Sequence, residues 1–277
     1  MIIGNREFCK DNKNYIFAIL NVTPDSFSDG GRFVIDGSVS IEPVLRTVEQ
    51  MIKDGADVID VGGESTRPGY TMISVEEEIE RTAPVIEAIK KNFDIPVSLD
   101  TYKSGVARAG IKAGADLIND IWGLKYSADM AKAISEGNVS VCIMHNRSDL
   151  NYVNYIEDVL SDIKDSLALA KSAGIKDERI ILDPGVGFAK SYEQNLYIIS
   201  RLDELCKLGY PVLLGTSRKS VIGLTLNLPA GERVEGTIAT SIIGCMKGAR
   251  FFRVHDVKEN RRALDMAEAI ISLKALN

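Results

Sequence analysis

Polar side chains follow a series of short apolar runs in this sequence, at the point where each run ends. Asn21 closes the run YIFAILN, and Asp100 follows the run IPVSL. Carboxylates accept N–H groups, amides and lysine donate to ring carbonyls and nitrogens, and arginine binds anions. Together these groups suit the edge of a flat, polar heterocycle next to an anion. The residues in question are Asn21, Asp60, Asp100, Asn119, His145, Asp183, the stretch 216–219, Arg253 and His255.

Other chemistries fit this residue set less well. The chain has two histidines and no HxH motif, which argues against a hydrolase that binds its metal through imidazole ligands. No serine or cysteine stands beside a histidine base, which argues against a covalent nucleophile. For any single aspartate the alternative is that it only caps the next helix. That alternative weakens when several complementary groups are expected at one mouth.

One pattern, repeated along the chain, predicts how these residues are brought together. A helix ends at a glycine, a short apolar strand follows, and polar residues appear where the strand stops. The pattern is clear in the stretches 53–63, 112–123 and 247–257. Weaker forms occur at 136–147, 178–188 and 208–219, and two more apolar runs lie at 15–21 and 95–101. Each of the eight reads as a parallel strand buried on both faces.

Helices are predicted between these strands. Apolar residues recur at helical spacing over 44–52 and 156–167. Ser74, with Glu77 three residues later, predicts a capping box at the start of the second helix, and Pro84 predicts a kink or a restart within it. Left-handed backbone just past a helix C-terminus is predicted at Gly55, Gly114 and Gly248.

Eight strand-then-helix units predict an α/β fold, a (β/α)8 TIM barrel, which typically takes about 250 residues. We expect one domain over residues 1–277, with residues 1–14 as an N-terminal hairpin or plug that closes the barrel bottom. A doubly wound open sheet is the alternative fold. In such barrels the chemistry lies at the C-terminal ends of the strands. The polar, glycine-containing segment 21–31 is predicted to be a mobile lid over that mouth.

Composition limits the partners. The net charge is −6 and no basic stretch is present, so we expect no nucleic-acid partner. The N-terminus becomes polar after three residues, which argues against a secretion signal or a membrane span. The four cysteines are far apart and form no CxxC pair, so free thiols in a reducing cytoplasm are expected.

The polar strand ends and the loops around them resemble the dihydropteroate synthase family of pterin-binding TIM barrels. The resemblance runs from about residue 15 to the C-terminus, and the first, second and seventh blocks below are the most specific. The blocks are NVTPDSFSDGG (21–31), DVGGESTRPG (60–69), DTYK (100–103), NDIWG (119–123), MHNR (144–147), LDPGVGFAK (182–190), GTSRKS (215–220) and RVHDV (253–257).

The resemblance implies a transferase of folate biosynthesis. It would condense 6-hydroxymethyl-7,8-dihydropterin diphosphate with p-aminobenzoate to give 7,8-dihydropteroate and diphosphate, with Mg²⁺ as cofactor and sulfonamides as inhibitors. An arylamine keeps a free lone pair at neutral pH, so no strong base is needed to activate it. Departure of diphosphate is the harder step, which favours a dissociative displacement without a covalent enzyme intermediate. The family also suggests a homodimer, with Ile242, Met246 and Met266 either at its contact or facing the barrel.

Transferred residue by residue, the resemblance implies three subsites. The pterin-binding residues would be Asp100, Asn119, Met144, Asp183, Lys219 and Arg253. The diphosphate-binding residues would be Asn21, Arg67, Arg253 and His255, with Asn21 also a ligand of Mg²⁺. The p-aminobenzoate-binding residues would be Phe27, Thr66, Pro68, Phe188, Ser217 and Lys219. The catalytic residues would be Lys219, Arg253, His255 and Asp29, of which Asp29 would stabilise positive charge on the pterin methylene.

Bland alternatives stay open for part of this set. Thr66 and Pro68 also fit an ordinary turn around Gly69, and Phe188 also fits a loop aromatic that covers core. A methyltetrahydrofolate:corrinoid methyltransferase would share the Asp and Asn pterin contacts and would depend on a cobalamin protein. A catalytically silent pterin-binding protein would share the pocket without releasing diphosphate.

Overall fold

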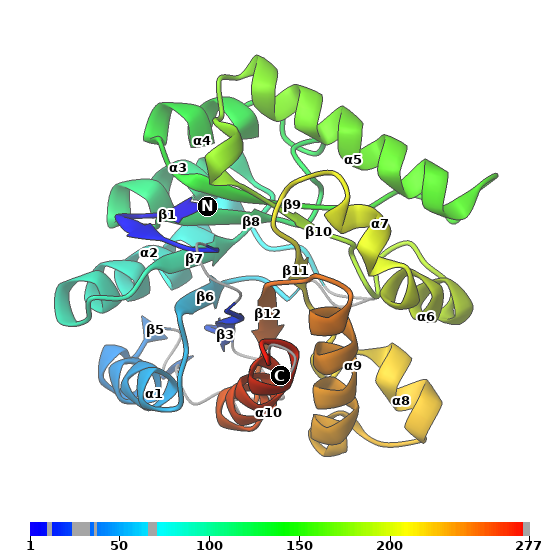
Figure 1. Cartoon of the computed structure of the whole chain (residues 1–277). Coiled ribbons are helices and arrows are strands. Elements are labelled where there is room, and N and C mark those ends of the chain that lie inside the picture. The colour runs from blue at the N-terminus through cyan, green and yellow to red at the C-terminus, as the bar shows by residue number, and fades with distance from the viewer. Residues whose placement is uncertain (10–12, 24–33, 36–37, 66–70, 274–277) are drawn as a thin grey trace.

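The computed structural model describes residues 1–9, 13–23, 34–35, 38–65 and 71–273. Eight parallel strands pair in chain order, and the last also pairs with the first. Strand β10 meets β11 through a single bridge between Leu182 and Val212, so the sheet closes into the predicted barrel and the open-sheet alternative is wrong (Figure 1). The strands are β3 (Tyr15–Asn21), β6 (Val58–Gly62), β7 (Val97–Asp100), β8 (Leu117–Asp120), β9 (Ser140–Met144), β10 (Ile180–Asp183), β11 (Leu213–Leu214) and β12 (Phe251–Val254).

Helices surround the barrel on its outer side (Figure 1). Strand residues alternate between two apolar layers: Ile16 and Ala18 belong to the core shared with the helices, whereas Phe17 belongs to the cluster inside the barrel. The helices are α1 (Ile41–Lys53), α2 (Val75–Asn92), α3 (Ser104–Ala113), α4 (Met130–Gly137), α5 (Tyr155–Ser172), α6 (Tyr192–Ser200), α7 (Leu202–Cys206), α8 (Ser220–Leu226), α9 (Val234–Met246) and α10 (Val257–Ile271). A small antiparallel pair, β4 (Val34–Ile35) and β5 (Ser38–Val39), precedes α1.

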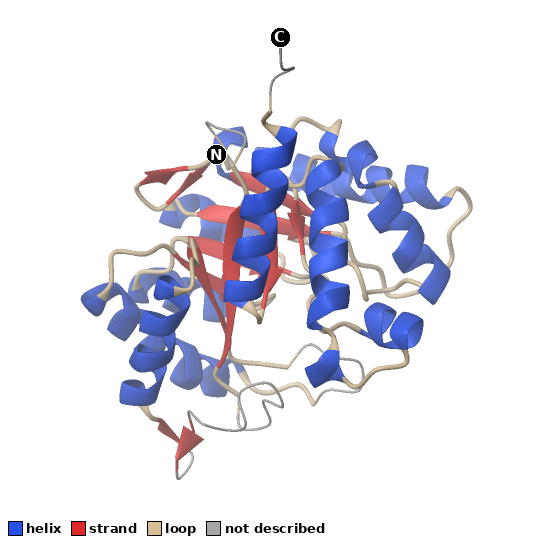
Figure 2. Cartoon of the chain, turned by 60° about the horizontal axis from the view of Figure 1, so that its bottom comes forward, coloured by secondary structure: helices blue, strands red, loops and turns tan. Residues whose placement is uncertain are grey.

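A hairpin lies at the end of the barrel where the strands begin (Figure 2). It is formed by β1 (Ile2–Ile3) and β2 (Arg6–Glu7), which pair antiparallel. Ile3 and Phe8 pack on the inward-facing residues of the barrel, and the Phe8 and Phe251 rings lie 5.9 Å apart. The predicted N-terminal hairpin is confirmed, and the mouth at the other end stays accessible.

Most local predictions hold. Left-handed backbone is found at Gly55, Gly114 and Gly248, with φ of 101°, 109° and 104°. The Ser74 hydroxyl accepts from the Glu77 N–H at 3.1 Å, but the Glu77 carboxylate pairs with Arg81, so only half of the predicted capping box forms. Helix α2 continues through Pro84 without a restart. Pro84 lies on the exposed face, where water can bind the carbonyl that loses its N–H partner.

Two further observations bear on the predictions from composition. All four cysteines are free thiols. Among the described residues, no helix is both long and apolar enough to cross a membrane.

Candidate active site

The C-terminal ends of the strands surround a cavity of about 340 Å³. The aspartates at the ends of β7 and β10 both line it, so they face one space from separate strands. Every predicted site residue that the structure describes lines this cavity, namely Asn21, Asp100, Asn119, Met144, Asp183, Phe188, Ser217, Lys219, Arg253 and His255. The remaining predicted residues, Phe27, Asp29, Thr66, Arg67 and Pro68, lie outside the described residues.

A second hollow, between α1 and the start of α10, has a volume of about 560 Å³. It includes His255 but none of the carboxylates at the strand ends. It therefore does not carry the predicted chemistry, and the smaller cavity is the candidate site.

Arg253 is held by two carboxylates at this cavity. Its Nε donates to Asp60 Oδ2 and its Nη2 to Asp100 Oδ2, both at 2.6 Å. Asp60 is completely buried within β6, where the Ser98 hydroxyl donates to its other oxygen at 2.5 Å. From the sequence we expect Asp60 at the mouth, but it does not line the cavity. Its function in the structure is to fix the guanidinium.

Asp100 keeps one oxygen for a ligand. Its Oδ1 is buried and has no hydrogen-bond partner among the residues that the structure describes. Burial raises the pKa of Asp100 to about 7, although the Arg253 guanidinium opposes this shift. A buried acceptor without a partner costs about 1–3 kcal/mol. A ligand N–H that reaches Oδ1 removes that penalty, so Asp100 is prepared to bind a donor.

Lys219 borders both a carboxylate and an aromatic ring. Its Nζ donates to the Val186 carbonyl at 2.5 Å and lies 4.7 Å from the centre of the Phe188 ring. Burial lowers the pKa of Lys219 to about 8, against the attraction of Asp183. Asp183 Oδ1 accepts from the Gly185 N–H at 2.7 Å, and burial raises the pKa of this carboxyl group. Acceptors and a donor for the edge of a ring thus lie next to an aromatic surface.

Ser217 and His255 are tied together at the rim. The Ser217 hydroxyl lies 3.0 Å from His255 Nδ1 and accepts from the His255 backbone N–H at 3.1 Å. Both residues line the cavity, so their polar groups are available beside Arg253 for an anion. The contact connects the loop after β11 to the end of β12.

Asn21 is positioned by its neighbour on β6. A side chain on Gly62 would bring its Cβ to 3.3 Å from Asn21 Oδ1, so glycine leaves room for the carboxamide. No hydrogen bond of the Asn21 carboxamide is found within the described ranges. No group of three His, Cys, Asp or Glu residues that could hold a metal is found there either. A cation at this place would need oxygen ligands from a substrate.

The structure corrects the prediction for His145. Its side chain turns away from the cavity and contacts Asp162 and Lys190 instead. Glu64, by contrast, lines the cavity and accepts from the Tyr102 hydroxyl at 2.5 Å, but it is not among the residues selected from the sequence. The available signal was its place inside the block DVGGESTRPG.

Comparisons with known proteins agree with this geometry. Residues 17–255 match the family described as pterin binding enzyme. The dihydropteroate synthase of Clostridium beijerinckii is 58% identical over 272 residues, which cover 98% of this chain and 99% of that protein.

Two solved structures are also similar. One is a dihydropteroate synthase from Clostridium difficile in the presence of pteroic acid, with a TM-score of 0.87, 47% identity and coverage of 93% and 97% of the two chains. The other is a Yersinia pestis dihydropteroate synthase with a sulfonamide drug complex, with a TM-score of 0.89, 38% identity and coverage of 95% and 96%. On the match over 17–255 and these identities, this chain belongs to the dihydropteroate synthase family of pterin binding enzymes.

Proposed function

We propose that this protein condenses 6-hydroxymethyl-7,8-dihydropterin diphosphate with p-aminobenzoate to form 7,8-dihydropteroate and diphosphate, a step of folate biosynthesis. The observation that carries the proposal is the unpartnered Asp100 Oδ1 in a cavity that Asn119, Asp183 and Lys219 also line. Two buried carboxylate acceptors with amide and ammonium donors complement the mixed N–H and carbonyl edge of a pterin. The relative with pteroic acid supports this choice of ring.

In this proposal the pterin lies deep in the cavity. Asp100 and Asp183 accept its N–H groups, and Asn119 and Lys219 donate to its acceptors. Met144 and the Arg253 guanidinium contact the ring faces, since guanidinium groups stack on aromatic planes. The two hydrogen bonds from Arg253 to Asp60 and Asp100 would hold its plane fixed during this contact.

The leaving diphosphate is assigned to the rim, at Asn21, Arg253 and His255, with Arg67 from the segment outside the described residues. The Asn21 carboxamide fits Mg²⁺, a hard cation that takes few protein oxygens and completes its shell with phosphate oxygens and water. Mg²⁺ bound there supplies positive charge beside the diphosphate. Arg253 and His255 stabilise the negative charge that grows as the C–O bond breaks, and Asp29 faces the positive charge on the methylene.

The p-aminobenzoate subsite is assigned to the other side of Lys219. Phe188 contacts the benzene ring, and Ser217 and the Lys219 stem complete the described part of the subsite. Phe27, Thr66 and Pro68 would complete it from the segments that are not described. Sulfonamides would bind at the same place, a choice supported by the sulfonamide drug complex of the Yersinia pestis relative. The arylamine then attacks with its own lone pair, so no residue is needed as a strong base.

The direct test mixes the purified protein with Mg²⁺, dihydropterin diphosphate and p-aminobenzoate and measures dihydropteroate and diphosphate. We expect both products in equal amounts without any cobalamin protein. A requirement for a cobalamin protein would favour the methyltransferase alternative. Pterin binding without diphosphate release would favour a silent binding protein.

A homodimer is the second part of the proposal. Helices α9 and α10 lie side by side (Figure 1) and expose large apolar side chains, with Met246 at 71% and Met266 at 60% exposure, whereas Ile242 packs against the core. Covering these methionines in a dimer contact would remove apolar surface from water. Sedimentation should show a dimer that Met246→Asp with Met266→Asp converts to a monomer. The control Leu224→Asp, at a position 68% exposed on α8, should stay dimeric.

Free thiols on all four cysteines suit a reducing compartment, and we propose the cytoplasm.

A further inference from the structure

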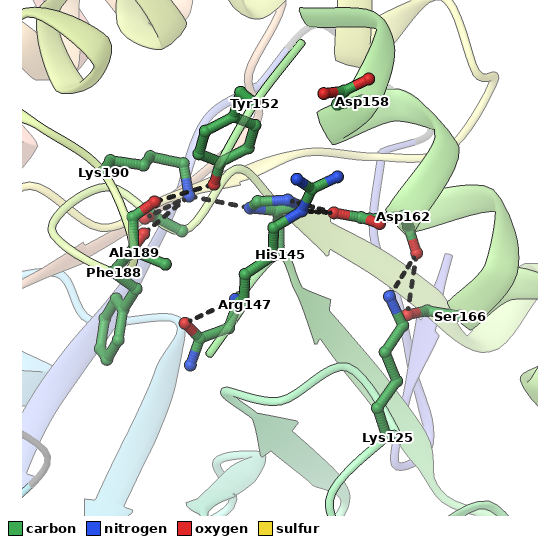
Figure 3. Close-up of polar contacts among 12 residues, drawn as sticks. Lys125, His145, Arg147, Tyr152, Asp158, Asp162, Ser166, Phe188, Ala189 and Lys190 are labelled. Carbon is green, nitrogen blue, oxygen red and sulfur yellow. Dashed lines mark hydrogen bonds and ion pairs between the residues drawn. The ribbon is translucent and has the colours of Figure 1, made fainter. Parts of the chain in front are cut away.

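A network of hydrogen bonds joins β9, α5 and the loop after β10, outside the set of residues that line the cavity (Figure 3). His145 Nε2 lies 3.0 Å from Asp162 Oδ2, and His145 Nδ1 lies 2.8 Å from Lys190 Nζ. A lysine ammonium only donates, so Nδ1 accepts and the N–H is on Nε2, directed at Asp162. Burial and the Lys190 charge lower the pKa of His145 to about 3, which keeps the ring neutral. The imidazole therefore has one defined tautomer.

Lys190 uses its other two N–H groups on its own loop. Its Nζ donates to the carbonyls of Gly185 and Phe188, both at 3.0 Å. An ammonium has three N–H groups, so with His145 all of them are bound within the protein. The side chain contributes no donor to a substrate and acts on the backbone of residues 185–189 instead.

The same loop is held by further side chains because its backbone is irregular. The Tyr152 hydroxyl donates to the Ala189 carbonyl at 2.8 Å, and the Gly187 N–H donates to Asn195 Oδ1 at 2.6 Å. Ala189 has a φ of +44°, in the left-handed region that residues with a Cβ rarely adopt. Such a conformation persists only where the surroundings impose it. The shape of the loop therefore depends on these hydrogen bonds.

This loop forms part of the wall of the cavity. Gly187 and Phe188 line it, and the Val186 carbonyl accepts from Lys219 Nζ. Displacement of the loop would move the Phe188 ring and release the Lys219 amine together. Asp100 and Asn119, by contrast, stand at the ends of β7 and β8, which hydrogen bonds to neighbouring strands keep in place.

We propose that Lys190, oriented by His145 and Asp162, is a positioning residue of the p-aminobenzoate subsite. It fixes the loop 185–189 so that Phe188 and Lys219 present one surface to the second substrate. This inference rests on the proposed function, because it assigns the subsite to that reaction. It predicts a selective effect, since the pterin keeps its contacts on the strands when the loop is loosened.

The test compares Lys190→Met with the wild-type protein at a pH below 7, because burial lowers the pKa of Lys190 to about 7 and the ammonium must prevail. Methionine keeps much of the side-chain volume and removes the donors. We expect the KM for p-aminobenzoate to rise about tenfold, as for loss of buried hydrogen bonds, with the KM for dihydropterin diphosphate within about twofold of wild type. The matched control is Lys125→Met, since Lys125 Nζ donates to the Asp162 carbonyl at 2.9 Å without touching the loop (Figure 3). Both KM values should stay unchanged in this control.

The outcomes separate the two proposals. Absence of product with wild-type protein rejects the proposed function. An active wild type, with Lys190→Met raising both KM values equally or neither, rejects the positioning role alone. If Lys190→Met does not fold, Tyr152→Phe decides, because it removes only the hydroxyl that binds the Ala189 carbonyl. A rise of about threefold confined to the KM for p-aminobenzoate supports the inference, and an unchanged value overturns it.

Discussion

Replacing Asp100 by asparagine tests the central contact of the site. Asparagine keeps an oxygen for Arg253 Nη2, which now binds Asp100 Oδ2 at 2.6 Å. Its NH₂ group then replaces Oδ1, the buried oxygen that has no partner among the described residues. A donor would face the N–H groups of the pterin, so one ligand hydrogen bond is lost and not replaced.

The expected magnitude follows from that exchange. Loss of a charge-assisted hydrogen bond in a buried site, with the ligand N–H left unpaired, costs about 2–3 kcal/mol. That energy corresponds to a rise of about 30- to 150-fold in the Kd for dihydropterin diphosphate. The remaining Arg253 contact, at Asp60, should keep the guanidinium in place, so the fold should survive.

The assay is isothermal titration of the pterin substrate over a range of pH. Since the ionised carboxylate is the acceptor and burial raises the pKa of Asp100 to about 7, wild-type affinity should fall as the pH drops through 7. Asp100→Asn should lack this step. The matched control is Asp57→Asn at the opposite end of the barrel, where Asp57 Oδ2 accepts from the Ile16 N–H at 2.7 Å. It should lower Tm and leave pterin affinity unchanged. A folded Asp100→Asn protein that binds the pterin within threefold of wild type would refute the reasoning.

Four other substitutions probe the remaining assignments. Lys219→Ala should weaken both substrates by at least tenfold in equilibrium binding, because Lys219 borders both subsites, and two unchanged affinities contradict this. Asp183→Asn should weaken the pterin selectively by about tenfold, and full-strength pterin titration would count against the contact. Asp29→Asn should lower kcat about tenfold in a folded protein, while an unaltered kcat removes Asp29 from the mechanism. Thr66→Ala and Pro68→Ala should change sulfonamide affinity more than pterin affinity, and equal changes would reject the division into subsites.

The ends of the strands could be predicted from the sequence because two simple rules coincide there. A strand buried on both faces must be apolar, and the C-terminal ends of parallel strands meet at one edge. Asp100 and Asp183 therefore had to face a common space once the barrel was expected. Asn119 and Lys219 follow from the same rules.

Depth and direction could not be predicted in the same way. Asp60 resembles the other strand-end aspartates in sequence, yet it lies one layer lower, where it binds Arg253. His145 directly follows β9, but the direction of its side chain depends on Asp162, seventeen residues later on another element. Helix α5 packing sets that contact, and a linear sequence does not specify it.

Pro84 shows that a local rule can also be too strict. A proline removes one helical N–H, which argues for a break when the helix is considered alone. On the exposed face of α2 the freed carbonyl has water, and burial of Val85 and Ile86 stabilises the helix on the other side.

The bridge between Leu182 and Val212 has a consequence for how catalysis and stability are linked. Adjacent strands elsewhere in the barrel share two to five paired positions, whereas β10 and β11 share this one. Asp183 immediately follows Leu182, and Lys219 lies in the loop that continues from β11. A substrate bound by both side chains adds bonds across the most weakly paired joint of the ring. Turnover is thereby coupled to the mechanical integrity of the scaffold: each binding event reinforces the circumference, and each product release returns it to its loosest form.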